Sequence, residues 1–351
     1  MHSAKNAAAM LTRTASHTAR TVLSKFYSSV AQTPRYVPRR AVMYVPGSDQ
    51  RKIDKVAAVA ADCVVLDCED GVALNQKEAA RNTIRATLEK KRSLFAGKDC
   101  SVRVNAVSSD LWKDDLASVL ASQHLPTTLH LPKVDSTRDI DMFASEVVRL
   151  LEGRHLEEPL RVFLFCESGR SLLRLAELCE HGLGLPPPLL LDGFVFGSDD
   201  YCADIGMTRS SLARELLYAR QKFVSVVRSF RLQAIDLVYI DYKNLAGLER
   251  QSVEGAEFGF TGKQVIHPCQ VDIVQRAFSP SPKRVQWARG LLEAYEKHQT
   301  QGAGAFTYQG SMIDMPLVLQ ARNVIATSAA QSSSTHTDGD LRAPSYSSPL
   351  A

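Results

Sequence analysis

Short apolar runs alternate with amphipathic segments along the chain from Ala41 onward. Each run is nearly continuous and rich in β-branched or aromatic residues, which is typical of strands buried on both faces of a parallel sheet. The predicted strands are Ala41–Val45, Cys63–Leu66, Ser101–Asn105, Thr127–Leu131, Arg161–Phe165, Gly193–Phe196, Ala234–Ile240 and Gln264–Ile266. The predicted helices between them are Arg51–Ala61, Gln76–Lys90, Leu111–Ser122, Arg138–Leu151, Ser171–His181, Arg209–Ser229, Asn244–Gly255 and Cys269–Phe278.

This alternation predicts an α/β protein with a (β/α)8 TIM barrel over residues 41–280, because its length suits one such barrel. A doubly wound open sheet is the alternative, but it usually has fewer strands and a glycine-rich first turn. The sequence contains neither glycine-rich phosphate-binding motif. A further helix over Pro282–Thr300 and a helical stretch ending near Ala326 predict a C-terminal helix and lid segment over residues 281–326.

The two ends of the chain differ from this pattern. Residues 1–48 contain no Asp or Glu, and the stretch is rich in Ser, Thr and Ala with scattered Arg. These features predict a mitochondrial transit peptide over residues 1–32 and hence a mitochondrial matrix protein; the alternative is a disordered basic tail. Residues 327–351 are Ser-rich without a hydrophobic pattern, which predicts a disordered tail.

Charge and cysteine content exclude several classes of function. The net charge is +4, but the basic residues of the first forty positions account for all of it, and the rest of the chain is mildly acidic. No basic surface therefore indicates nucleic acid, and no apolar run is long enough to cross a membrane. The seven cysteines form no CxxC pair and are expected to be reduced core residues.

Acidic residues follow three of the predicted strands. They are Asp67, Glu69 and Asp70 after the second strand, Glu167 after the fifth, and Asp199 and Asp200 after the sixth. Each one alone could be a helix cap or a loop ion pair, but together they lie where α/β folds build active sites. Glu167 and one of the adjacent pair Asp199–Asp200 would suit Mg²⁺, which prefers oxygen ligands.

Arg103 is the candidate group for binding an anionic substrate. It alternates with valines in the third strand, so its side chain is expected to point to the opposite face, into the barrel. A guanidinium suits bidentate capture of a carboxylate. An ion pair with Asp67 or Glu69 is the alternative, and the two roles are compatible.

Several motifs together resemble one family, the HpcH/HpaI aldolases and citrate lyase β-subunits. They are Tyr44–Ser48, Leu66–Val72, Arg103–Asn105, Leu131–Val134, Glu167–Ser168, Phe196–Asp200 and Gly262–Pro268. The resemblance covers about residues 41–326 and implies a magnesium-dependent TIM-barrel lyase that cleaves carbon–carbon bonds in CoA thioesters. The leader and the segment Gly310–Asp314 are similar to mitochondrial members of the family.

The resemblance also implies roles for individual residues. Glu167 and Asp200 would bind Mg²⁺, and Arg103 would hold the keto-acid carboxylate. Asp67, Glu69 and Asp70 would form an acidic cluster beside the metal. Arg51 and Lys55 would contact CoA, and a solvated helix face is the alternative for these two residues. Asp314 would be the catalytic acid–base group on a lid that reaches a neighbouring subunit's site in a homotrimer.

The reaction implied by the resemblance is cleavage of (S)-citramalyl-CoA to pyruvate and acetyl-CoA, with malate synthase or β-methylmalate synthase activity on the side. A malyl-CoA or citryl-thioester lyase is one alternative. A non-catalytic, CoA-binding regulatory protein is an alternative of another class.

Overall fold

Eight parallel strands close into one barrel in the computed structural model, which describes residues 36–299 and 306–333. The strands are β1 (Ala41–Pro46), β2 (Cys63–Asp67), β3 (Asp99–Arg103), β4 (Thr128–Leu131), β5 (Leu160–Cys166), β6 (Leu189–Phe196), β7 (Gln233–Asp236) and β8 (Gly262–Val265). Each strand pairs in parallel with its neighbour in sequence, and β1 also pairs with β8. The predicted TIM barrel is confirmed, and the open-sheet alternative is excluded.

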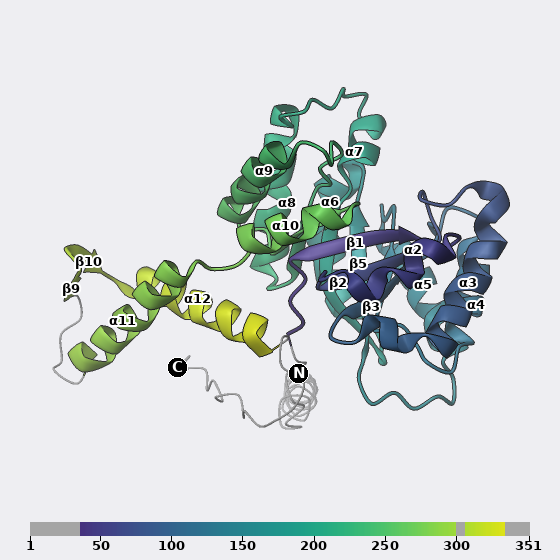
Figure 1. Ribbon diagram of the computed structural model, residues 1–351, viewed down its shortest axis with the longest axis horizontal. Helices are drawn as coiled ribbons and strands as arrows, with labels where there is room; N and C mark the ends of the chain where they lie inside the picture. Colours follow the sequence, from purple (N-terminus) through teal and green to yellow (C-terminus); the bar gives the residue numbers. More distant parts are fainter. Residues whose placement is uncertain (1–35, 300–305, 334–351) are drawn as a thin grey trace, which may run out of the picture. The chain divides into compact units, whose positions relative to one another are not determined.

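Helices follow the strands in sequence and pack against the outer face of the barrel (Figure 1). They are α2 (Gln50–Asp54), α3 (Lys77–Lys90), α4 (Trp112–Leu120), α5 (Thr137–Leu150), α6 (Gly169–Leu183), α7 (Ser198–Asp204), α8 (Leu217–Ser229), α9 (Leu245–Phe258) and α10 (Val271–Ala277). Single 3₁₀ turns lie at Val56–Ala58, Leu74–Gln76, Arg92–Phe95, Arg214–Leu216 and Pro268–Gln270. One large apolar core fills the layer between strands and helices, and a smaller cluster that includes Val65 and Phe163 fills the barrel.

Several predicted elements differ from the observed ones for local reasons. The helix predicted over Arg51–Ala61 ends at Asp54, and a 3₁₀ turn leads to the extended residue Val59. The helix predicted over Arg209–Ser229 begins only at Leu217, because Ala213 has a left-handed backbone (φ 51°) that interrupts a helix.

Two differences affect the ends of strands near the site. The seventh strand ends at Asp236 rather than Ile240, and its pairing with β8 ends at Asp236 and Lys263. The Asp236 carboxylate forms ion pairs with Arg220 and Lys263. Asp199 and Asp200 do not end a strand but lie in the first turn of α7, a helix that was not predicted.

The C-terminal segment consists of α11 (Pro282–Gln299), α12 (Met315–Ser333) and a hairpin of β9 (Phe306–Tyr308) and β10 (Ser311–Ile313). This hairpin was not predicted. It turns at Gln309 and Gly310, which both have positive φ, as a two-residue type I′ turn requires. The segment has a small apolar core of its own, which includes Leu291 and Val318.

Helix α12 continues past Ala326 to Ser333 and so enters the segment predicted to be a disordered tail. The predicted transit peptide and residues 334–351 lie outside the described residues. Within the described ranges, no helix combines the length and the apolarity that crossing a membrane would require.

A buried ionic network fills the barrel at the amino-terminal ends of the strands. Arg39 is fully buried and pairs with Asp99 and Asp192, and its guanidinium also donates to the Thr128 hydroxyl at 2.9 Å. Asp192 is left out of the β5–β6 register, where the pairing shifts. Burial alone would raise the pKa of Asp99, but the Arg39 charge together with hydrogen bonds from Thr127, Arg39 and Thr128 outweighs it and lowers that pKa to about 2.

We predict that Arg39→Met destabilises the protein strongly, because the substitution leaves the Asp99 carboxylate buried without its cation. Breaking a buried pair from one side costs about 3–5 kcal/mol. Urea denaturation measures this loss. Arg85→Ala is the control: it removes an exposed helical pair with Glu89 and is expected to cost less than about 0.5 kcal/mol. Equal stability of the Arg39 variant and the wild type would contradict the prediction.

Candidate active site

A cavity of about 690 Å³ lies at the carboxyl ends of the barrel strands. This is the end at which TIM-barrel enzymes build their active sites. Its walls come from β1, β8, α2 and the segments that follow β2, β5 and β6. The charged residues that line it are Lys52, Lys55, Asp67, Asp70, Arg103, Glu167, Asp199 and Asp200. The predicted convergence of acidic strand ends is therefore present in the structure.

Arg103 is clamped between two acids at the base of this cavity. Its guanidinium donates to both carboxylate oxygens of Asp67, at 2.7 and 2.6 Å, and its Nη1 atom forms an ion pair with Glu69 at 2.8 Å. The aromatic ring of Tyr44 lies beneath it, with the guanidinium carbon 5.1 Å from the ring centroid. The expected ion pair is present with both acids. A guanidinium has five N–H donors, so two remain for a ligand.

Asp67 is fully engaged in holding this arrangement. Besides Arg103, its carboxylate accepts the backbone N–H groups of Glu69 and Gly71, each at 2.9 Å. Burial would raise the pKa of Asp67, but Arg103 and these hydrogen bonds lower it below its ordinary value. Asp67 is thus a permanently charged anchor for Arg103 and for the turn after β2.

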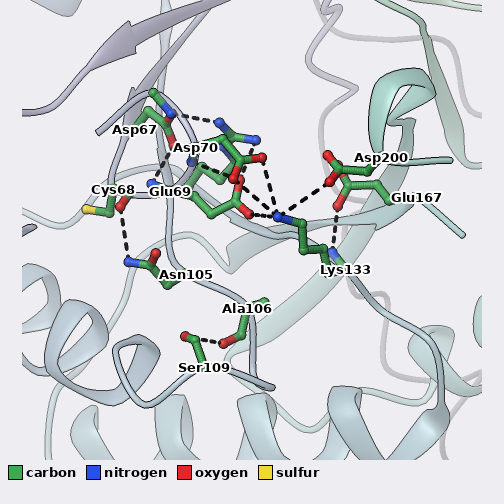
Figure 2. A network of polar contacts seen from close by, with 12 residues as sticks. Asp67, Cys68, Glu69, Asp70, Asn105, Ala106, Ser109, Lys133, Glu167 and Asp200 are labelled. Carbon is green, nitrogen blue, oxygen red and sulfur yellow. Dashed lines mark hydrogen bonds and ion pairs between the residues drawn. The ribbon is translucent and has the colours of Figure 1, made fainter. Parts of the chain in front are cut away.

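Lys133 is a central residue of the site for which the sequence indicated no role. Its ammonium lies 2.6 Å from Glu69, 3.2 Å from Asp70 and 3.6 Å from Asp200. Figure 2 shows it between Glu69 and Asp70 on one side and Asp200 on the other. Its backbone is left-handed, with φ 54°, which is uncommon for a residue other than glycine. A local distortion of this kind gives no signal in a single sequence.

Glu167 directly follows β5 and is buried. One carboxylate oxygen accepts the backbone N–H of Lys133 at 2.7 Å. Burial raises the pKa of Glu167 to about 8, and the nearby charges of Glu69 and Asp200 add to the effect. The carboxylate is therefore poorly compensated by the protein itself.

Gly197 makes room for this carboxylate. A Cβ atom at Gly197 would lie 2.3 Å from the Glu167 Oε1 atom, which is closer than non-bonded atoms approach. The absence of a side chain at this position lets Glu167 lie against the start of α7, beside the acids of that helix.

The structure separates the roles of Asp199 and Asp200. Asp199 lines the cavity with a half-exposed side chain and is paired with Arg209 at 2.6 Å. Asp200 lies beside Glu167 and close to the Lys133 ammonium (Figure 2). Burial raises the pKa of Asp200, as it does for Glu167. Asp200 is accordingly the better partner of Glu167 for a shared cation.

The two predicted CoA contacts differ in position. Lys55 lines the cavity, whereas Arg51 is exposed on α2 and does not line it; Lys52 does so instead. His267 also lines the cavity. It stacks on Tyr242 and accepts the backbone N–H of Cys269.

Asp314 is not among the residues that line the cavity of its own chain. It directly precedes α12, and its carboxylate accepts the backbone N–H of Leu317 at 3.3 Å. This is the position of a helix N-cap. Within one chain, the structure does not bring Asp314 together with Glu167 and Asp200.

The donor set of the cavity fits a hard divalent cation. Among the described residues, no group of three or more His, Cys, Asp or Glu side chains is arranged to enclose a metal. Mg²⁺ does not need such a group, since it is usually held by one or two carboxylates with water and substrate. Glu167 and Asp200 supply two such carboxylates, both with raised pKa values that a cation would reverse.

The model of one protein family, HpcH/HpaI aldolase/citrate lyase, matches residues 40–268, which include the whole barrel from β1 to β8. The chain belongs to this family. It is 50% identical to human mitochondrial citramalyl-CoA lyase over 91% of this chain and 94% of the relative. It is 31% identical to the β-subunit of Escherichia coli citrate lyase, over 82% and 92% of the two chains.

Solved structures of family members agree with the fold. CitE from Mycobacterium tuberculosis, in complex with magnesium, acetoacetate and coenzyme A, covers 83% of this chain and 98% of its own, with a TM-score of 0.65 and 28% identity. The citrate lyase β-subunit of the same organism, complexed with oxaloacetate and magnesium, matches with a TM-score of 0.56 and 27% identity, over 69% of this chain and 98% of its own.

Proposed function

We propose that this protein is a magnesium-dependent carbon–carbon lyase that cleaves (S)-citramalyl-CoA to pyruvate and acetyl-CoA. The observation that carries the proposal is the 50% identity to a citramalyl-CoA lyase along nearly the whole of both chains. The acids and the arginine that such chemistry needs meet in one cavity. This chain is also proposed to be mitochondrial, as the human, rat and mouse relatives are.

Glu167 and Asp200 would hold the magnesium ion. When bound, such an ion supplies Lewis acidity to the carboxylate and hydroxyl oxygens of the substrate and so lowers the pKa of the hydroxyl group. Family members solved with magnesium and a keto acid support magnesium as the ion. Glu69 and Asp70 lie on the other side of Lys133 and contribute negative charge around the ion (Figure 2).

Arg103 would bind the carboxylate that leaves as pyruvate. Asp67 and Glu69 fix the plane of the guanidinium, so the two remaining N–H groups are oriented before the substrate arrives. Such preorganisation reduces the entropy lost on binding. The ion pairs of Arg103 with Asp67 and Glu69 would therefore also orient Arg103 for the substrate.

Lys52 and Lys55 would contact the phosphate groups of CoA. Lys52 lies on α2 and Lys55 at its end, and the cavity they line also contains the apolar residues Val59, Ile266 and Pro268. This combination of cations and apolar surface suits a long thioester with an anionic end. Lys52 takes the place of Arg51 in this proposal because Lys52 lines the cavity and Arg51 does not.

Asp314 would accept the hydroxyl proton at the site of a neighbouring subunit in a homotrimer. Its absence from the cavity of its own chain supports an arrangement in which a second copy supplies it. A carboxylate on the hairpin–α12 segment can reach another subunit without changing the barrel. Run in reverse with glyoxylate, followed by thioester hydrolysis, the same groups would give malate synthase activity.

The alternatives differ in substrate or in class. A citryl thioester and malyl-CoA are the alternative substrates, because the relatives include a citrate lyase β-subunit and a (3S)-malyl-CoA thioesterase. A non-catalytic CoA-binding protein would not need Arg103, Glu167 and Asp200 in one cavity.

We predict that the purified protein cleaves (S)-citramalyl-CoA with a kcat/KM at least about tenfold higher than its kcat/KM for malyl-CoA or for a citryl thioester. A tenfold ratio corresponds to about 1.4 kcal/mol. Coupled assay of the released keto acids, with Mg²⁺ and with a chelator, measures this ratio. Loss of activity in the chelator is expected because the paired acids need a divalent cation. Thioester binding without turnover of any compound would favour the regulatory alternative.

We predict that Glu167→Gln and Asp200→Asn each lower kcat by more than about 100-fold, because each removes a charged oxygen ligand while preserving size. Asp199→Asn is the matched control, since Asp199 pairs with Arg209, and it is expected to keep activity within about threefold. Steady-state kinetics and circular dichroism distinguish loss of chemistry from loss of fold. A larger effect at Asp199 than at Asp200 would exchange the two assignments.

We predict that Asp314→Asn and Glu167→Gln chains, each inactive alone, recover activity when they are co-expressed. In a cyclic trimer mixed at random, about one site in four joins an intact Glu167 to a neighbour's intact Asp314. Asparagine is also a good N-cap, so α12 is expected to stay folded. No recovery in purified mixed oligomers would place the complete site within one chain.

A further inference from the structure

We infer that Lys133 is the resident counter-ion of the metal site, and that its ammonium competes with the divalent cation for the same carboxylates. Lys133 would thereby set the metal affinity of the site without being a ligand. The inference rests on the proposed function only in taking Glu167 and Asp200 as the metal-binding pair.

The first support is the position of the ammonium. It lies within 3.6 Å of Glu69, Asp70 and Asp200, which come from segments after two different strands. The Lys133 side chain is only about one-third exposed, so water screens these contacts incompletely. Figure 2 shows the ammonium between the acids that follow β2 and those beside α7.

The second support is the balance of charge. Asp67, Glu69, Asp70, Glu167 and Asp200 face the cavity or its base, whereas the cations paired directly with them are Arg103 and Lys133. Arg103 is committed to Asp67 and Glu69. Lys133 is therefore the cation that neutralises Asp70 and Asp200 in the described part of the chain, and a divalent ion would meet its repulsion there.

The third support is the backbone of Lys133. The left-handed φ of 54° turns its N–H to Glu167, at 2.7 Å, while the side chain reaches the opposite acids. Backbone conformations of this kind persist where the surrounding structure fixes them, and they concentrate at functional sites. One residue thus holds the proposed ligand Glu167 with its main chain and opposes the metal with its side chain.

Removing the ammonium is expected to tighten metal binding. Lys133→Met keeps the length of the stem but removes the charge, so the dissociation constant for Mn²⁺, used as a probe for Mg²⁺, should fall at least about threefold. Lys133→Arg keeps the charge and is expected to bind as the wild type does. Lys133→Gly removes the charge and adopts φ 54° freely, so it should bind as tightly as Lys133→Met.

The test is direct titration of the metal-free full chain with Mn²⁺, without substrate, by electron paramagnetic resonance of the free ion. A merely structural role for Lys133 would loosen binding on substitution, so tightening is specific to the inference. Weaker or unchanged binding in both Lys133→Met and Lys133→Gly overturns it. Wild-type protein that binds no Mn²⁺ at the cavity would instead overturn the proposed metal site, and Glu167→Gln in the same titration identifies that case.

Discussion

Repulsion between carboxylates is the constraint on which the active site depends. Asp67, Glu69, Asp70, Glu167 and Asp200 converge at one end of the barrel, and Arg103 and Lys133 are the cations that pair with these acids among the described residues. Arg103 and two backbone N–H groups lower the pKa of Asp67. Burial raises the pKa values of Glu69, Glu167 and Asp200. A divalent ion therefore gains the most beside these three acids.

The repulsion between the active-site acids lies at the opposite end of the barrel from the ionic network that stabilises the fold. At the opposite end, Arg39 balances Asp99 and Asp192 in a buried network that needs no ligand. Strands β2 and β5 run from that end to the site, with an apolar barrel interior between, including Val65 and Phe163. In TIM barrels generally, one face of the strands serves stability and the other serves chemistry.

The eight strands and their parallel order could be predicted from the sequence because fully buried strands leave continuous apolar runs. The boundaries of helices were harder to predict where the backbone conformation of one residue determines them. The left-handed backbone of Ala213, which delays the start of α8, is an example. Helix α7 was missed because its short sequence follows β6 with little helical periodicity, so Asp199 and Asp200 looked equivalent.

The acids, Arg103 and their position at the strand ends could be predicted from residue type and order. The importance of Lys133 could not, since it depends on a left-handed backbone and on acids distant in sequence. The choice between Arg51 and Lys52 depends on the rotation of α2, a helix too short for periodicity to fix.

Positive and negative side chains are unevenly distributed around the cavity. Lys52 lies on α2 and Lys55 at its end, whereas Asp67 ends β2 and the acids Asp70, Glu167 and Asp200 lie in the segments that follow β2, β5 and β6. The positive and negative charges of the lining thus come from different segments of the barrel rim. A ligand that carries phosphates at one end and reacts at the other therefore meets an electric field that can orient it before any close contact forms.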